Sequence, residues 1–284
     1  YKGISGFNIK SLATDPSNLV EGEIWFNSTS GTLKVAPLVR AWASGGALSP
    51  GIEGTAGCGI QTAALMAAGN NGSGATDASQ EYNGSSWTAG GTMATAATGN
   101  AAAGILTAAI TMGGEPMPTR STLSEEYNGS AWTAGGALNN GRAMGAGAGT
   151  QTATLFFGAF DGSTTYAYTE SYNGASWTSE NTLTTPTRQL AGAGTATAGL
   201  AAAGYNGTAI TAVSEEYNGT SWTAGNSLNT ARSKLSGDGL QTAAFVVGGD
   251  TGSASAATEE YDGTDWTTSP ASLGLSLIHI SEPT

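Results

Sequence analysis

Tryptophan recurs through this chain at an almost constant interval. Six tryptophans stand 45, 45, 45, 45 and 44 residues apart: Trp42, Trp87, Trp132, Trp177, Trp222 and Trp266. A tyrosine precedes the last five by five residues: Tyr82, Tyr127, Tyr172, Tyr217 and Tyr261. Repeats of about 40 to 50 residues built from short strands are typical of propeller blades, whereas β-solenoid rungs are usually shorter. We therefore expect an all-β protein made of repeated four-stranded sheets.

The residues between each tyrosine and the following tryptophan predict a hairpin. Asn-Gly or Asp-Gly follows every one of these tyrosines and favours a two-residue type I′ turn. Such a turn would pair Tyr82 with Ser85 and Gln80 with Trp87. Side chains alternate along a strand, so Tyr82 and Trp87 share one face, which a neighbouring sheet must cover. Segments rich in Ala and Gly, such as 191–195, suit inner strands crowded around an axis.

Composition excludes several classes of protein. The chain has 44 glycines among 284 residues and only 11 % charged residues, which does not fit a coiled coil or a long helix. A net charge of −12 disfavours binding to nucleic acid or to an anionic membrane. No run of about 18 apolar residues is present, so we expect no membrane span.

Both ends of the chain differ from the repeats. The first residue is Tyr1 rather than Met, so we expect the natural start to lie upstream. Residues 275–284 look like the in-frame translation of a transposase sequencing adapter, and they contain the only histidine, His279. We therefore expect three parts: a leader over 1–36 with a hairpin formed by 23–27 and 32–35, a repeat domain over 37–274, and an artefactual tail over 275–284.

The repeats resemble the kelch family. The features that carry the resemblance are a double glycine after an apolar strand, the tyrosine and tryptophan, and an arginine that opens the next unit. The double glycines are Gly113-Gly114 and Gly248-Gly249, and the arginines are Arg142, Arg188 and Arg232. Only two units keep both glycines, and the spacing from Tyr to Trp is tighter than in many kelch repeats. The resemblance implies a kelch-type β-propeller of about six blades, with seven as the alternative: five complete four-stranded units and a partial one at Trp42.

Two segments are also similar to phage proteins. Tyr-Asn-Gly-Thr-Ser-Trp repeats like that ending at Trp222 occur in predicted virion proteins of marine bacteriophages. The leader over 15–35 is similar to a segment common in phage tail and fibre proteins. These resemblances imply a virion or extracellular location, with the N-terminal region contacting other virion proteins.

The residues available for chemistry argue against an enzyme. The kelch-like family includes a copper oxidase, but copper at such sites favours imidazole, and the chain has no histidine outside the adapter-like tail. We interpret Cys58 as a small buried residue. Acids stand side by side at 125–126, 215–216 and 259–260, but neighbouring strand residues point to opposite faces and form no dyad. We expect no catalytic residue, no cofactor and no metal. Calcium at 70–77 and at 161–163 is an alternative, although turn chemistry explains these segments equally well.

Arginines and glutamates recur together in the repeats. Each arginine lies ten or eleven residues after a tryptophan, and a glutamate lies seven before the next one. We predict contacts between the guanidinium and carboxylate of these pairs, because that glutamate shares the buried aromatic face. The pairs are Arg142 with Glu170, Arg188 with Glu215, and Arg232 with Glu259. The first unit has Ile52 and Gln80 at these positions, and the second has Ala97 but keeps Glu125.

Loops that vary between the repeats are the candidate binding surface. They are 70–77, 115–121, 161–168, 205–210 and 250–256, and we place them opposite the nearly invariant Asn-Gly turns. Aromatic and polar side chains suited to holding a sugar are Asp161, Tyr166, Tyr168 and Tyr205, with Glu115 and Arg120 as further polar contacts. We expect a non-enzymatic, receptor-binding virion protein that recognises a glycan or protein on a host surface. The alternatives are a secreted or surface kelch-like protein of bacteria that binds or processes carbohydrate, and an intracellular adaptor of the kelch kind.

Overall fold

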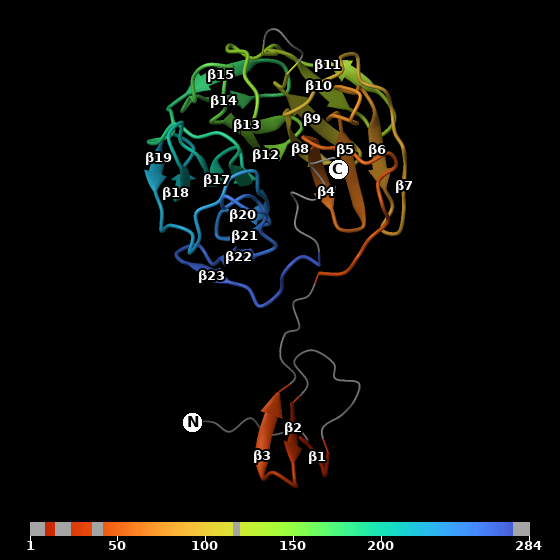
Figure 1. Ribbon diagram of the computed structural model, residues 1–284, viewed down its shortest axis with the longest axis vertical. Helices are drawn as coiled ribbons and strands as arrows, with labels where there is room; N and C mark the ends of the chain where they lie inside the picture. Colours follow the sequence, from red (N-terminus) through yellow and green to blue (C-terminus); the bar gives the residue numbers. More distant parts are fainter. Residues whose placement is uncertain (1–8, 15–23, 36–41, 116–119, 275–284) are drawn as a thin grey trace. The chain divides into compact units, whose positions relative to one another are not determined.

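The computed structural model describes residues 9–14, 24–35, 42–115 and 120–274 (Figure 1). Every regular element in these ranges is a β-strand. Contacts divide the chain into two units, one preceding Trp42 and one from Trp42 onward. The expected boundary between 36 and 37 and the adapter-like tail over 275–284 lie outside the described residues.

The first unit contains a three-stranded sheet. Its strands are β1 (Lys10–Leu12), β2 (Ile24–Asn27) and β3 (Thr32–Val35). β2 and β3 pair antiparallel, which confirms the expected hairpin, and β1 lies parallel to β2. The turn is held by the Asn27 side chain, whose Oδ1 accepts the N–H of Thr29 at 3.1 Å and of Ser30 at 2.9 Å.

The second unit contains five antiparallel four-stranded sheets, each made of consecutive strands. The first has β4 (Ala56–Ile60), β5 (Ala63–Ala67), β6 (Ser79–Tyr82) and β7 (Trp87–Ala89). The second has β8 (Ala101–Ile105), β9 (Ala108–Met112), β10 (Ser124–Tyr127) and β11 (Trp132–Ala134). The third has β12 (Ala146–Thr150), β13 (Ala153–Phe157), β14 (Thr169–Tyr172) and β15 (Trp177–Glu180). The fourth has β16 (Ala191–Thr195), β17 (Ala198–Tyr205), β18 (Ile210–Tyr217) and β19 (Trp222–Ala224). The fifth has β20 (Ser236–Leu240), β21 (Ala243–Val247), β22 (Thr258–Tyr261) and β23 (Trp266–Thr268). The expectation of an all-β protein built from repeated four-stranded sheets is confirmed.

The first strand of each sheet contacts the first strand of the next. β4, β8, β12, β16 and β20 follow one another in this way around a central hollow (Figure 1). These strands are rich in Ala and Gly, as expected for strands that approach one another closely. A ladder of backbone bonds joins the sheets just before these strands. In the series Gly54, Gly99, Met144, Gln189 and Lys234, the N–H of each residue after the first donates to the carbonyl of the residue before it in the series, over 2.6 to 2.9 Å.

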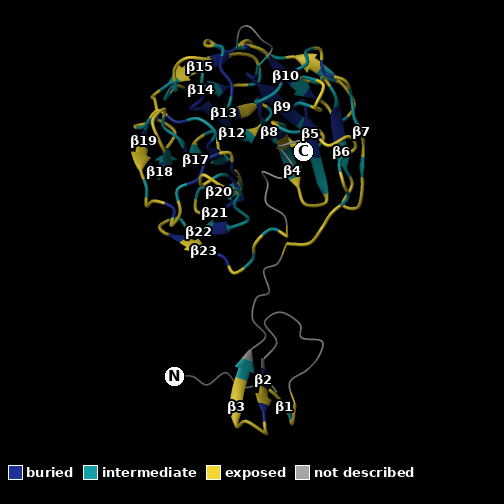
Figure 2. Ribbon diagram, in the orientation of Figure 1, coloured by how far each residue is buried: buried dark blue, intermediate teal, exposed yellow. Residues whose placement is uncertain are grey.

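The second strands form the most buried layer (Figure 2). Aromatic residues of the outer hairpin cover them from the neighbouring sheet, as the Phe157 and Trp222 rings show with centroids 4.9 Å apart. The outer tryptophans of the second to fifth sheets also donate their indole N–H to a hydroxyl on the third strand of the preceding sheet, as Trp222 does to Thr169 Oγ1 at 2.9 Å. The same bond joins Trp132 to Ser79, Trp177 to Ser124, and Trp266 to Ser214.

Trp42 repeats this contact although it precedes the first four-stranded sheet. Its indole N–H donates to Thr258 Oγ1 at 2.9 Å, and its ring lies 5.9 Å from that of Phe245. Trp42 therefore packs on the fifth sheet as Trp132, Trp177, Trp222 and Trp266 pack on the sheet before their own.

The Asn-Gly turns differ from the sequence-based prediction. Tyr82 pairs directly with Trp87, and Gln80 pairs with Ala89, so a four-residue loop replaces the expected two-residue turn. The cause is the Asn83 side chain, whose Oδ1 accepts the N–H of both Ser85 (3.0 Å) and Ser86 (2.9 Å). The expected shared face is nevertheless confirmed, because the Tyr82 and Trp87 ring centroids lie 5.0 Å apart.

Backbone conformation explains the preference for glycine at the double-glycine positions. In the second sheet unit Gly113 and Gly114 adopt φ values of 67° and 105°. The first unit adopts the same turn with Ala68 at 60° and Gly69 at 116°. Positive φ favours glycine but does not forbid alanine. The loss of one glycine in some repeats therefore leaves the backbone path unchanged.

Two of the three predicted Arg–Glu pairs form. Arg142 bonds to Glu170 in the third sheet unit, and Arg232 bonds to Glu259 at 2.8 Å in the fifth. Arg188 does not reach Glu215, so that prediction is wrong. The carbonyl of Thr187 accepts the N–H of Ala159 as that of Arg142 accepts the N–H of Gly114. Arg188 therefore stands one residue beyond the pairing position.

Candidate functional site

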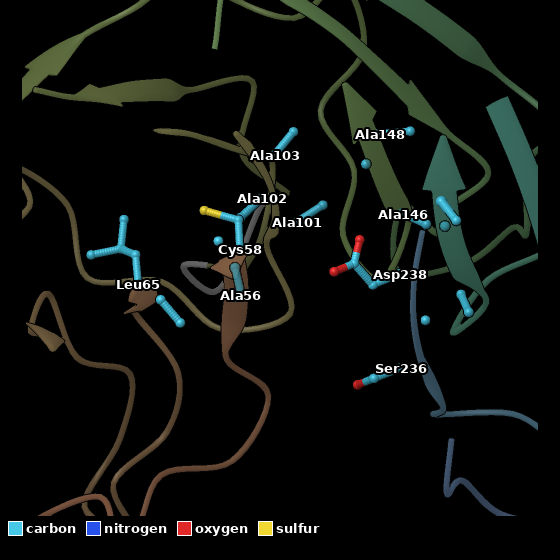
Figure 3. Close-up of a pocket in the computed structure, with 18 of the residues that line it drawn as sticks. Ala56, Cys58, Leu65, Ala101, Ala102, Ala103, Ala146, Ala148, Ser236 and Asp238 are labelled. Carbon is cyan, nitrogen blue, oxygen red and sulfur yellow. The ribbon is translucent and has the colours of Figure 1, made fainter. Parts of the chain in front are cut away.

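The central hollow is a cavity between the first strands of the five sheets. It has a volume of about 750 Å³ and is lined mainly by Ala and Gly of the five first strands (Figure 3). Cys58 of β4 and Asp238 of β20 are among its lining residues, and Cys58 packs against the cluster that contains Leu65 (Figure 3). Burial, and secondarily the charge of Asp238, raises the pKa of the Cys58 thiol to about 12. The thiol is therefore protonated at neutral pH and is a poor nucleophile.

The adjacent acids have separate structural roles. Glu125 accepts the N–H of Ala94 at 2.8 Å, whereas Glu126 on the other face accepts the Tyr172 hydroxyl at 2.6 Å. No group of three His, Cys, Asp or Glu side chains suited to a metal ion occurs within the described ranges. In segment 70–77 the Asn70 and Asn71 side chains accept backbone N–H groups of Gly72 and Ser73, which is ordinary turn chemistry.

The loops that vary between units lie opposite the Asn-Gly turns. They join the second and third strands of each sheet, whereas the Asn-Gly turns join the third and fourth. In an antiparallel sheet these two connections emerge at opposite ends. We call the end with the variable loops the variable end; segment 116–119 of its second loop lies outside the described residues.

Three predicted residues cluster in the loop of the third sheet. The Tyr166 and Tyr168 rings stack with centroids 4.5 Å apart and planes 11° from parallel. The Tyr166 hydroxyl donates to Asp161 Oδ2 at 2.9 Å. Asp161 Oδ1 accepts the backbone N–H of Thr164 and Ser163, each at 2.8 Å. These bonds hold the pKa of Asp161 well below its usual range, so the loop carries a negative charge at neutral pH.

An arginine between two aromatic rings connects this loop to the next sheet. The Arg188 guanidinium carbon lies 4.0 Å from the centroid of the Phe160 ring and 4.9 Å from that of Tyr205. Arg188 and Tyr205 also form a β-bridge, which holds the side chains together. Tyr205, one of the predicted binding residues, therefore lies beside the loop that contains Phe160 and Asp161.

The remaining two predicted residues come from the second sheet, and one of them lies near the same aromatic ring. Arg120 forms an ion pair with Glu115 at 2.9 Å. Its guanidinium carbon lies 5.6 Å from the Phe160 centroid. Arg120, Phe160, Arg188 and Tyr205 are therefore joined by contacts across three sheets, and Asp161, Tyr166 and Tyr168 belong to the same loop as Phe160. We call these residues, with Glu115, the aromatic–arginine patch.

Sequence reasoning missed Phe160 and Arg188 as members of this patch. Phe160 occupies a position held by Asn70, Glu115 and Asp250 in other units, as the equivalent β-bridges show. An aromatic residue where three other units have a polar one could have pointed to Phe160 from the sequence. The signal for Arg188 was its spacing of eleven residues from Trp177, one more than that of the paired arginines.

Comparisons with known proteins leave the family undetermined. No family model matches the chain, and no curated protein matches it significantly. Across the described ranges, no helix has the length and apolar character needed to cross a bilayer.

Proposed function

We propose that this chain is a non-enzymatic binding protein that recognises a glycan or protein on a host surface through its variable end. The observation that carries the proposal is the aromatic–arginine patch, in which loops from three sheets meet on a repeated scaffold. Stacked tyrosines supply flat apolar faces, and Asp161, Arg120 and Arg188 supply charged hydrogen-bonding groups beside them. This combination suits the apolar faces and hydroxyls of a sugar.

The scaffold that we propose is a kelch-type β-propeller of six blades. The contact of Trp42 with Thr258 supports this count, because it repeats the contact between successive sheets. Residues after Trp42 also approach the first sheet in the repeated manner. A Cβ at Gly45 would lie 3.1 Å from the Tyr82 hydroxyl, as one at Gly90 would lie 3.3 Å from that of Tyr127. Trp42 would thus belong to the outer strand of a sixth blade, between the fifth and the first.

The place of action that we propose is a virion, with the three-stranded unit contacting other virion proteins. The resemblance of the leader and the repeats to phage proteins supports this, as does the low content of charged residues. A secreted or surface protein of bacteria that binds or processes carbohydrate is the alternative. Capsid and tail genes beside the coding sequence would favour the virion.

Binding measurements on the purified chain test the proposal. We expect the protein to bind bacterial cells or immobilised polysaccharides, and joint substitution of Tyr166, Tyr168 and Tyr205 by Ala to abolish the signal. Ser85→Ala combined with Thr220→Ala is the control, because both residues are exposed in Asn-Gly turns. Binding that survives the tyrosine substitutions but is lost in the control would place the site at the end with the Asn-Gly turns and contradict the proposal. Release of reducing sugar from a bound polysaccharide would favour the carbohydrate-processing alternative.

A further inference from the structure

Arg188 is a cation that the described structure does not neutralise. Its guanidinium lies against Phe160 and Tyr205, but it forms no ion pair with a described Asp or Glu. Its Nε is buried without a hydrogen-bond partner, as are the Nε atoms of Arg142 and Arg232, so the missing ion pair is what distinguishes Arg188. The other two arginines of the repeat series, Arg142 and Arg232, are each neutralised by a buried glutamate.

The repeat does not require a cation at this position. The matching residues of the other units are Glu53, Thr98, Ala143 and Ser233, as their equivalent β-bridges show. Partial desolvation of a charge is unfavourable unless an opposite charge or hydrogen bonds compensate it. Arg188 is therefore a departure from the repeat whose guanidinium remains available to a ligand.

The neighbouring charges are already committed to other groups. Glu115 forms its ion pair with Arg120, and the Asp161 carboxylate accepts bonds from its own loop and from Tyr166. Lys234 lies 3.7 Å from Asp250 in the next unit. Arg188 is therefore a cation without an ion-pair partner beside two aromatic rings, whereas Asp161 keeps its negative charge but has its oxygens engaged by N–H and O–H donors of its own loop.

We infer that the aromatic–arginine patch binds an acidic polysaccharide by accepting the carboxylate of a uronic acid unit on Arg188. The inference rests on the proposed glycan-binding function and adds the class of sugar. The planar guanidinium offers paired N–H donors that match the geometry of a carboxylate. The rings of Phe160 and Tyr205 fix the guanidinium plane and provide apolar surface for the sugar ring.

Polygalacturonate and alginate, each beside its methyl-esterified form, are the probes that test this inference. Esterification removes the charge and leaves the sugar backbone unchanged. We expect the parent protein to bind at least one acidic polymer about tenfold or more tightly than its ester, because a charge-assisted hydrogen bond is lost. Arg188→Gln is expected to weaken binding to the acidic polymer by a similar factor and to leave binding to the ester unchanged. Arg188→Lys is expected to give an intermediate affinity, because it keeps the charge but loses the fork.

Control variants and ligands separate this inference from the proposed function. Lys234→Gln removes a nearby exposed cation that lies outside the patch, and we expect it to leave binding unchanged. Thermal unfolding checks that Arg188→Gln remains folded. If the variant unfolds, the difference in affinity of the parent protein for the acidic polymer and for its ester tests the inference instead. Equal binding of acid and ester, or of dextran sulfate and the acidic polymers, would overturn the uronate inference and leave general glycan binding standing. Absence of binding to every polysaccharide and to cells would overturn both.

Discussion

The second and third four-stranded sheets each contain a buried glutamate at the same position, but only the glutamate of the third sheet pairs with an arginine. In the third sheet Glu170 bonds to Arg142, whose guanidinium carbon also lies 4.2 Å from the centroid of the Phe156 ring. In the second sheet Glu125 is equally buried, yet Ala97 stands where Arg142 stands in its neighbour. A small cavity of about 10 Å³, lined in part by Ala97 and Glu125, occupies this region.

The shared role of the carboxylates is to hold backbone rather than to pair with arginine. Glu125 accepts the N–H of Ala94 at 2.8 Å and of Thr95 at 3.2 Å, and Glu170 accepts the N–H of Asn139 at 2.8 Å. Glu215 and Glu259 bond to the matching loops of their own units. Each glutamate therefore fastens the segment that enters its sheet, and arginine is an addition present in two units.

The largest difference between the two sheets is expected from Arg142→Ala. The substitution would leave Glu170 charged and buried without its cation, and we expect a loss of about 3–5 kcal/mol in the free energy of unfolding. Chemical denaturation measures this loss. The double variant Arg142→Ala with Glu170→Gln should be no less stable than the single one, because the unpaired charge is gone. A loss below about 1 kcal/mol would mean that the third sheet, like the second, does not depend on the arginine.

Neutralising the buried carboxylate should cost the third sheet more stability than the second. Glu170→Gln leaves Arg142 buried without an anion, and we expect a loss of about 3 kcal/mol. Glu125→Gln keeps one carbonyl acceptor for the loop and strands no cation, so a loss of about 1 kcal/mol is expected. The denaturation midpoints of the two variants provide the comparison. Equal losses would contradict the different roles that the structure assigns to these residues.

Alkaline pH should affect the two sheets alike, which makes this the smallest expected difference. Burial, and then the hydrogen bond to a glutamate of the preceding sheet, raises the pKa of Tyr127 in β10 and of Tyr172 in β14. An unfolded tyrosine ionises near pH 10, so this stabilisation is complete below that pH and declines as pH rises above it. We expect thermal stability to fall above about pH 10, together with the appearance of phenolate absorbance. Tyr127→Phe and Tyr172→Phe should each weaken the pH dependence by a similar amount; a change in only one would show that the Arg–Glu pair influences the tyrosine contact.

The sequence predicted the general plan of the repeat domain correctly but placed two details wrongly. The strand content, the shared face of Tyr82 and Trp87, and the pairs of Arg142 and Arg232 all follow from periodicity. The turn after Tyr82 was misplaced because the Asn83 side chain competes with the backbone for the turn hydrogen bonds. Arg188 was misassigned because a shift of one residue moves a side chain to a different neighbour.

The sequence alone determined the five repeated sheets and the residues that face a neighbouring sheet, because a constant period and strand alternation are local properties. It also identified the six polar and aromatic residues of the variable loops. Only the tertiary structure decided that Arg120 lies near Phe160, and that Arg188 lies between Phe160 and Tyr205. The physical reason is that the patch is formed by loops of three sheets, whose approach depends on how the sheets pack around the central hollow. No spacing along the chain reports that distance.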